Sequence, residues 1–265
     1  MLMKESSFIV PRDRTKETIA RVRSFFETLR TIIPENVFSR LIDKTQKTTD
    51  AFAIDPAKYT FDEKIIAPGG ECHVYTLHSL EATVPSLVIK IDTCKTRNID
   101  TLFRRAQYVQ HDYETLKEWY QAIPTLIPEE YHFIGKTPPA IGHRSAFFTL
   151  QKFFGNADNI QDVFRGIDKE TLLQILRTNT RLQADFRKFV DITKQHAVQH
   201  DAMVDTLGDK NVALIQQEKE MHLMVLDPHH ILHPATTDRK NHAKLMADLQ
   251  YLEDIVTALD STSAS

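Results

Sequence analysis

With 265 residues, 42% apolar and 26% charged, the chain can build one large globular domain or two lobes around a substantial core. The net charge of −3 gives no reason to expect a nucleic-acid partner, and two cysteines are too few for a disulfide framework or a cysteine-rich metal site. Because no apolar stretch approaches the roughly 20 residues of a membrane span and the N-terminus lacks a secretory signal, we expect a soluble, cytoplasmic protein with no membrane partner. Delivery as an effector without a cleaved signal stays open.

Residues 1–55 are expected to form a helical extension. Residues 13–45 carry apolar side chains at the three- and four-residue steps of an amphipathic helix. These side chains are Ile19, Val22, Phe25, Phe26, Leu29 and Ile32. Pro34 is expected to end that helix, a second short helix is expected over residues 37–42, and residues 44–56 are typical of a connector. The extension carries no catalytic motif, so we expect it to pack against the next domain or a partner.

From Tyr59 the pattern changes to that of strands. We predict strands over residues 59–66, 73–80 and 86–91, with Gly69 and Gly70 in the turn between the first two. Lys90 lies inside an apolar, β-branched run, where a purely structural strand would rarely place a lysine. A functional lysine and a plain position at the end of an edge strand both remain open.

Residues 99–121 are predicted to form an amphipathic helix. Its apolar stripe consists of Leu102, Ala106, Val109, Tyr113, Leu116 and Tyr120. Asp112 lies three residues after Val109 and four before Leu116, so it borders the buried stripe. Glu114 has polar helical neighbours and should face water.

The next elements are two strands and three helices. The strands are expected over residues 124–134 and 144–150, with a turn-forming segment at 137–142. Asp168 is expected to cap a helix over residues 171–177. A long helix follows, with an apolar face of Leu182, Phe186, Phe189, Val190, Thr193 and Ala197. The last helix is expected over residues 241–259.

The stretch from residue 200 to residue 230 carries the chemistry. A polar loop over residues 205–211 precedes two apolar runs that flank a charged turn, which indicates a β-hairpin. Asp205 and Asn211 stand before the first strand, and Asp227 ends the second. A phosphoryl-transfer site needs one carboxylate to orient the attacking hydroxyl, and an amide and a second carboxylate to hold magnesium on the nucleotide. An ordinary acidic hairpin is the alternative.

This order of residues resembles the catalytic loop and metal-binding strands of the protein-kinase-like fold. The resemblance implies that Asp205 orients the substrate hydroxyl and that Asn211 and Asp227 bind Mg²⁺. The sequence departs from the family in three ways. Leu-Asp-Pro replaces Asp-Phe-Gly, His-Arg-Asp is missing, and Asp205 precedes Asn211 by six residues instead of the family's five.

The predicted strands from residue 59 to residue 91 are similar to the N-lobe of the same fold. In that lobe a Gly-rich loop covers the phosphates and a lysine on the third strand reaches them. The likeness implies that Gly69, Gly70 and Val74 contact ATP and that Lys90 binds its phosphates. With Val74 placed at the family's valine, only Gly69 of the three family glycines is kept.

In the kinase fold an acid on the following helix pairs with that lysine. The segment Asp112-Tyr-Glu-Thr-Leu116 resembles the family's Glu-x-x-x-Leu, so Asp112 is the preferred partner of Lys90 and Glu114 the alternative. Residues 146–152 have the character of the interlobe hinge. Backbone groups near Leu150 and Lys152 would then meet the adenine.

The resemblance predicts an α+β, two-lobed fold. An antiparallel-sheet N-lobe over residues 56–152 would follow the helical extension, and a helical C-lobe would cover residues 153–265. Only 38 residues (265 − 227) follow Asp227, with no Ala-Pro-Glu motif, so the resemblance leads us to expect a reduced C-lobe, as in small, atypical bacterial Ser/Thr kinases.

The predicted function is an ATP- and Mg²⁺-dependent phosphotransferase acting on a hydroxyl, most simply a Ser/Thr of a protein substrate. A pseudokinase that binds nucleotide or protein, and an aminoglycoside-type small-molecule kinase, are the alternatives. A zinc hydrolase is disfavoured, because Ala197 follows His196 where a His-Glu-x-x-His motif needs its general base. The sequence does not indicate the oligomeric state.

Overall fold

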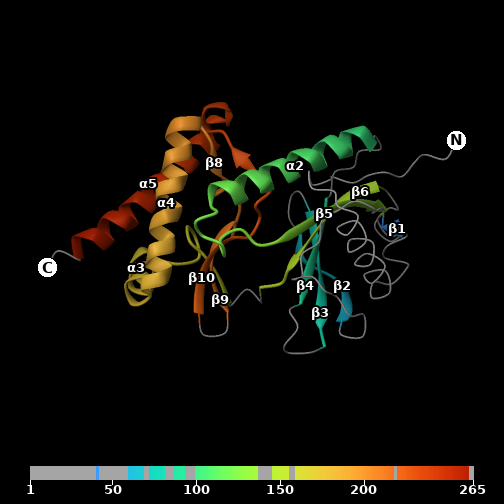
Figure 1. The fold of residues 1–265 in the computed structure, drawn as a ribbon, viewed down its shortest axis with the longest axis horizontal. Coiled ribbons are helices and arrows are strands. Elements are labelled where there is room, and N and C mark those ends of the chain that lie inside the picture. The colour runs from blue at the N-terminus through green and yellow to red at the C-terminus, as the bar shows by residue number, and fades with distance from the viewer. Residues whose placement is uncertain are drawn as a thin grey trace. The chain divides into compact units, whose positions relative to one another are not determined.

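The computed structural model describes residues 40–41, 59–68, 72–80, 86–92, 99–136, 145–154, 159–217 and 220–262. The chain divides into two compact units, Met1–Gln110 with Glu129–Phe153, and His111–Pro128 with Phe154–Ser265. Four α-helices and antiparallel sheets make up the described part of the chain (Figure 1). None of these helices is long and apolar enough to cross a bilayer. The predicted helix over residues 13–45 lies outside the described ranges, apart from Arg40 and Leu41, and the domain boundaries at residues 55 and 152 stay predictions.

The first unit is built on a six-stranded antiparallel sheet with the order β1-β5-β6-β4-β3-β2. Its strands are β1 (Arg40–Leu41), β2 (Tyr59–Pro68), β3 (Cys72–Ser79), β4 (Leu87–Asp92), β5 (Glu130–Lys136) and β6 (Ser145–Lys152). The strands predicted over residues 59–66, 73–80, 86–91 and 144–150 are therefore confirmed within two residues at each end.

The central strand β4 is buried along its whole length. Because side chains alternate along a strand, Leu87, Ile89 and Ile91 face one side and Lys90 the other. Lys90 lies opposite Val74 on β3 and Thr149 on β6. The Lys90 side of the sheet carries buried polar residues, which are Thr76, Lys90, Asp92, Glu130, His132, Thr149 and Gln151.

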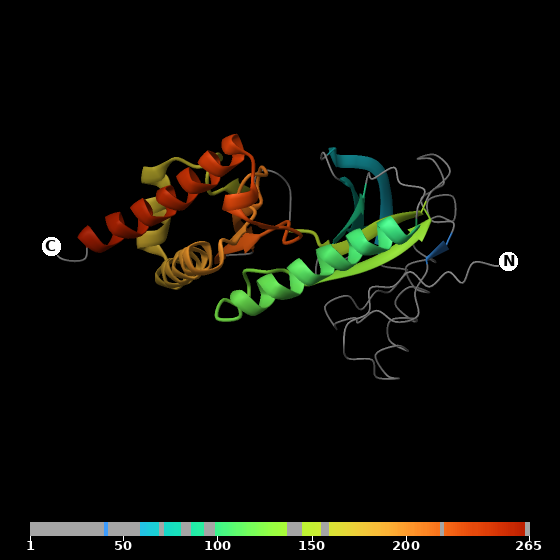
Figure 2. The same cartoon turned by 90° about the horizontal axis from the view of Figure 1, so that it is seen from above.

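Helix α2 (Ile99–Trp119) matches the helix predicted over residues 99–121. Its first half lies along the polar side of the sheet (Figure 2). Two side-chain contacts hold it there: Arg105 forms an ion pair with Asp92, and the Gln110 amide lies 2.9 Å from Nδ1 of His132. The helix therefore covers the polar face of the sheet within the first unit.

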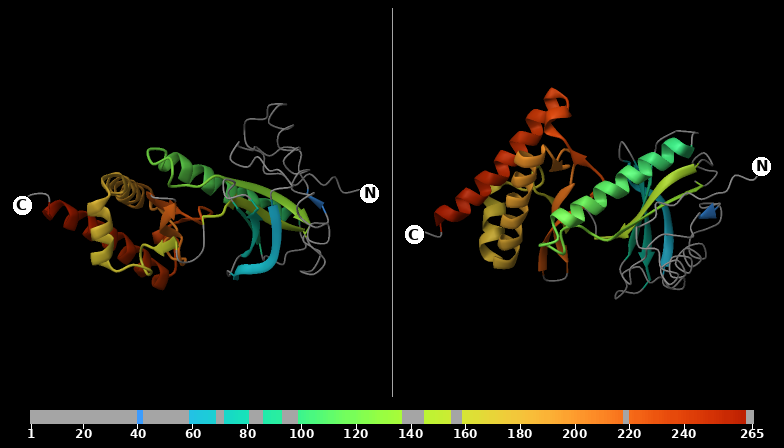
Figure 3. Two further views of the ribbon diagram at one scale, coloured as in Figure 1. Left: turned by 90° about the horizontal axis from the view of Figure 1, so that it is seen from below. Right: turned by 45° about the horizontal axis from the view of Figure 1, so that its top comes forward.

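The second unit combines three helices with short strands. The helices are α3 (Lys169–Thr178), α4 (Thr180–His200) and α5 (Arg239–Thr262), and a 3₁₀ turn, η5 (Pro234–Thr236), precedes α5. The strands are β7 (Ile160–Asp162), β9 (Val212–Gln217) and β10 (Glu220–Val225) in one sheet, and β8 (Met203–Val204) with β11 (Ile231–Leu232) in another. Figure 3 shows α4 beside α5 in this unit. The predicted hairpin and all three helices are confirmed.

The core of the second unit forms where these elements present their apolar faces. Its fully buried side chains include Leu116, Leu172, Phe186, Phe189, Leu214 and Leu252. Each such side chain contributes about 1.5–3 kcal/mol on burial. Tyr120 is also buried, and its hydroxyl lies 2.7 Å from that of Thr193 on α4. Burial raises the pKa of Tyr120.

Two predictions of local structure are wrong. Instead of forming a short helix over residues 37–42, Arg40 and Leu41 pair as β1 with Lys136 and Gly135, so pairing with a sheet edge outweighs a weak helical pattern. The strand predicted over residues 124–134 starts only at β5, because the chain first turns from Tyr120 to Leu126 through i to i+3 hydrogen bonds. The prolines at 124 and 128 lack the N–H that a sheet ladder requires.

Asn179 joins α3 to α4 and caps the second helix. Its side-chain oxygen accepts a hydrogen bond from the backbone N–H of Leu182 at 2.9 Å. Asn179→Ala should lower the free energy of unfolding by about 1 kcal/mol, because the first turn of α4 loses its cap. Asn179→Asp keeps an acceptor and should stay within a few tenths of a kcal/mol of wild type. Urea denaturation of the three proteins measures the difference, and equal losses in both variants would contradict the capping role.

Candidate functional site

Lys90 is a buried cation held by an acid of its own sheet. Its ammonium lies 3.4 Å from Oε1 of Glu130, and the two side chains are 10% and 0% exposed. The second carboxylate oxygen of Glu130 lies 3.2 Å from Nε2 of His132. A buried charge is tolerated only when it is paired and hydrogen-bonded. The strand therefore fixes the position of a positive charge, as a phosphate-binding lysine requires.

The predicted ATP-contacting residues lie in this sheet as far as the structure describes them. Val74 is directly opposite Lys90, Leu150 pairs with Ile89, and Lys152 pairs with Leu87 at the exposed end of β6. Gly69 and Gly70 lie outside the described residues. Contact with a nucleotide stays a prediction for all of them.

In the second unit, Asp205 opens the loop that follows β8. The Asp205 carboxylate accepts a hydrogen bond from the backbone N–H of Leu207 at 2.8 Å. The Asp205 N–H donates to the carbonyl of His230, which keeps the start of the loop beside β11. The carboxylate is thus oriented by its own loop.

Asn211 and Asp227 are brought together by the pairing of β9 with β10. The N–H of Leu226 donates to the carbonyl of Asn211 at 2.8 Å, and Asp227 is the next residue after this pairing. The Asn211 amide packs on Gly208, where an added Cβ would lie 2.5 Å from Nδ2 of Asn211. Nδ1 of His229 lies 3.0 Å from the Asp227 carboxylate and orients it.

The electrostatics of Asp205 link it to the same cluster. Burial raises the pKa of the Asp205 carboxyl, and the charge of Asp227 raises it further, while hydrogen bonding and His230 act in the opposite direction. Asp205, Asn211 and Asp227 therefore gather at one end of the hairpin. Carboxylate and amide oxygens are ligands that Mg²⁺ accepts, and a partly desolvated carboxylate can receive a proton from a hydroxyl.

Asp112 is 4% exposed, while Glu114 is exposed, as the helical pattern predicts. The Asp112 carboxylate accepts a hydrogen bond from the backbone N–H of Ile231 at 3.0 Å. This contact anchors β11, the strand that pairs with β8 ahead of Asp205. The pairing of Asp112 with Lys90 stays a prediction.

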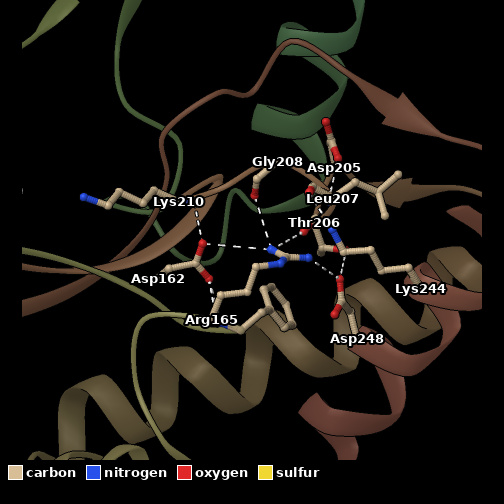
Figure 4. Close-up of polar contacts among 10 residues, drawn as sticks. Asp162, Arg165, Asp205, Thr206, Leu207, Gly208, Lys210, Lys244 and Asp248 are labelled. Carbon is tan, nitrogen blue, oxygen red and sulfur yellow. Dashed lines mark hydrogen bonds and ion pairs between the residues drawn. The ribbon is translucent and has the colours of Figure 1, made fainter. Parts of the chain in front are cut away.

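Sequence reasoning missed the residues that support the loop from behind (Figure 4). The Asp162 carboxylate accepts hydrogen bonds from the backbone N–H groups of Phe164, Arg165 and Lys210. Lys210 has a left-handed backbone conformation with φ of 62°, which is uncommon for a residue with a side chain. The hydrogen bond from the Lys210 N–H to Asp162 stabilises this conformation. No local pattern joins Asp162 to a loop more than 40 residues further along the chain, so only the fold reveals the contact.

Comparison with known proteins gives little guidance. No protein-family model and no curated protein sequence matches the chain. A solved structure of an alpha kinase from Entamoeba histolytica is similar to it with a TM-score of 0.28 and 10% sequence identity. The match covers 63% of this chain and 62% of the alpha kinase chain, so this chain spans less than two thirds of that protein.

Removing the carboxylate charge beside Lys90 should destabilise the first unit. Glu130→Gln leaves the ammonium without the carboxylate that lies 3.4 Å away, so we expect a loss of unfolding free energy on the order of 3 kcal/mol. The exposed Glu118→Gln serves as the matched control and should change little. Adding Lys90→Met to Glu130→Gln should cost less than the sum of the two single changes. Additive losses in urea denaturation would contradict the pairing.

Asp205→Asn should stabilise the protein at neutral pH. Because the folded state raises the pKa of Asp205, it favours the protonated form, and the ionised carboxylate destabilises the fold at any pH above that raised pKa. The gain in Tm should therefore be present at pH 7 and disappear as the pH falls below the ordinary aspartate value of ~3.9. Thermal unfolding from pH 3 to pH 8 measures it, with the exposed Asp209→Asn as control. A gain that persists at pH 3 would show that charge is not its cause.

Proposed function

We propose that this protein is an ATP-dependent phosphotransferase that moves the γ-phosphate to a hydroxyl, most simply that of a protein serine or threonine. The observation that carries the proposal is the gathering of Asp205, Asn211 and Asp227 at one end of the hairpin in the second unit. Two carboxylates and an amide in this order are what a phosphoryl-transfer site with magnesium needs.

Each residue has a distinct role in the proposed reaction. Asn211 and Asp227 would hold Mg²⁺, which neutralises charge on the phosphates of ATP. Asp205 would orient the acceptor hydroxyl and take its proton. The acceptor oxygen forms a bond to the γ-phosphorus, the bond from that phosphorus to the bridging oxygen of ADP breaks, and ADP leaves with the bond's electron pair. Lys90 would bind phosphate oxygens.

A nucleotide-binding pseudokinase is the second candidate, because His-Arg-Asp and two of the three family glycines are missing. This candidate predicts binding of MgATP without transfer. An aminoglycoside-type kinase differs from the main proposal only in its acceptor, a small molecule instead of a protein side chain.

Thermal unfolding with and without MgATP tests the nucleotide site. At 100 times its dissociation constant a ligand adds about 2.7 kcal/mol, or roughly 5–10 °C for a chain of this size. We expect a Mg²⁺-dependent rise in Tm for wild type that Lys90→Ala and Asp227→Asn weaken. Matched controls are Lys169→Ala and Asp191→Asn, both at exposed positions on helices outside the loop, and these should respond as wild type does.

Transfer is then followed with γ-labelled ATP, by labelling of the protein itself and by release of inorganic phosphate. Label transfer that Asp205→Asn abolishes supports the phosphotransferase. A Tm rise without transfer supports the pseudokinase. An unchanged Tm in wild type overturns both.

A further inference from the structure

We propose that Arg165 is a positioning residue that holds the loop from Asp205 to Asn211 in the shape its chemistry requires. The inference rests on the proposed function and extends it to a residue outside the predicted site. Arg165 lies just after β7, and its guanidinium points into the back of the loop (Figure 4).

Three consecutive carbonyls of the loop accept hydrogen bonds from cationic side chains. Nη1 of Arg165 donates to the carbonyls of Thr206 at 3.1 Å and Gly208 at 3.4 Å. Nζ of Lys244, on α5, donates to the carbonyl of Leu207 at 2.9 Å. Because every carbonyl of this segment is engaged, the loop cannot rotate its peptide groups without breaking a charge-assisted bond.

Carboxylates flank the guanidinium, and each also binds the loop. Nη2 of Arg165 lies 3.5 Å from Asp248 on α5, which accepts a hydrogen bond from the Thr206 hydroxyl at 2.8 Å. Nη1 lies 3.9 Å from Asp162, which accepts the N–H of Lys210. The Asp162 and Asp248 side chains are 6% and 13% exposed and that of Arg165 is 27% exposed, so the carboxylates are buried and the guanidinium is partly open to solvent. Arg165 thus links β7 and α5 through the loop.

The shape of the loop sets the positions of both predicted functional groups that it carries. Asp205 accepts the N–H of Leu207, one of the residues whose carbonyl is held. The Asn211 amide packs on Gly208, whose carbonyl Arg165 binds. A shift of residues 206–208 would therefore displace Asp205 and Asn211 together, whereas Asp227 is placed by β10.

Arginine and lysine should differ at this position. The planar guanidinium presents donors in a fixed fork and reaches two carbonyls and a carboxylate at once, whereas a lysine ammonium is a single point of charge on a flexible stem. Arg165→Lys should therefore recover only part of what Arg165→Met loses. Arg181→Met is the matched control, because Arg181 pairs with Glu220 at an exposed position in the same unit, with both side chains about two-thirds exposed.

The first measurement is hydrogen–deuterium exchange of the full-length protein, which needs no activity. Arg165→Met should accelerate exchange of the Leu207 and Lys210 amides about tenfold or more. The loss of a hydrogen bond to a charged donor shifts the equilibrium for local opening of the loop by about that factor. Arg165→Lys should fall between Arg165→Met and wild type, and Arg181→Met should match wild type. Unchanged exchange in Arg165→Met overturns the proposal. If Arg165→Met does not fold, Arg165→Lys and Thr206→Val, which removes the bond to Asp248, decide it by the same readout.

The second measurement separates positioning from a purely structural role. The assay is the release of phosphate from MgATP. Arg165→Met should lower kcat about 10- to 100-fold, because a small misplacement of reacting groups has an effect of that size. The KM for ATP should change by less than about threefold. Faster exchange with an unchanged kcat overturns the positioning role. If wild type neither transfers label nor releases phosphate, the proposed function fails, and exchange alone then decides whether Arg165 holds the loop.

Discussion

The pairing of charges that have been removed from water is the constraint on which both units depend. In the first unit the ammonium of Lys90 sits within the sheet beside Glu130, whose side chain is fully buried. An ion pair of this kind contributes little net stability compared with apolar residues of the same size, because both ions lose their hydration. Removing one partner alone is costly all the same, because it takes the counter-ion away from a buried charge.

In the second unit, paired charges hold a loop. A polar segment without regular structure would ordinarily lie at the surface and move. Here Arg165 and Lys244 bind the loop's carbonyls, and Asp162 and Asp248 balance their charge. The loop's backbone is held by contacts from β7, from the turn after it and from α5, elements distant from the loop in sequence.

Secondary-structure elements could be predicted from the sequence where one hydrophobic period, that of a helix or of a strand, dominates a segment. Helices α2 to α5 and the hairpin of β9 and β10 follow from apolar spacing, and the Asp168 cap follows from local chemistry. The same spacing placed Asp112 in the interior and Glu114 at the surface. Predictions failed where pairing partners or prolines decide the structure, as at β1 and before β5.

Candidate site residues could be predicted only where they stand in a recognisable order along the chain. Asp205, Asn211 and Asp227 do so, and strand pairing brings them together. Glu130 and Arg165 do not, since the contacts that link them to the candidate site, with Lys90 and Thr206, span 40 and 41 residues. Neither lies in a motif, and a charged residue in a strand or a turn is by itself unremarkable in sequence. The contacts of both residues arise from tertiary structure.

The location of Glu130 also bears on how the proposed activity could be controlled. In protein kinases the acid that pairs with the phosphate-binding lysine is carried by a helix, and movement of that helix switches the enzyme. Here the carboxylate at 3.4 Å from Lys90 belongs to β5, which is joined to β4 through β6 by backbone ladders. The backbones that carry these two side chains are therefore held together by strand pairing. Under the proposed function, the sheet would therefore position the lysine, and on–off control would act on the loop or on access of the acceptor.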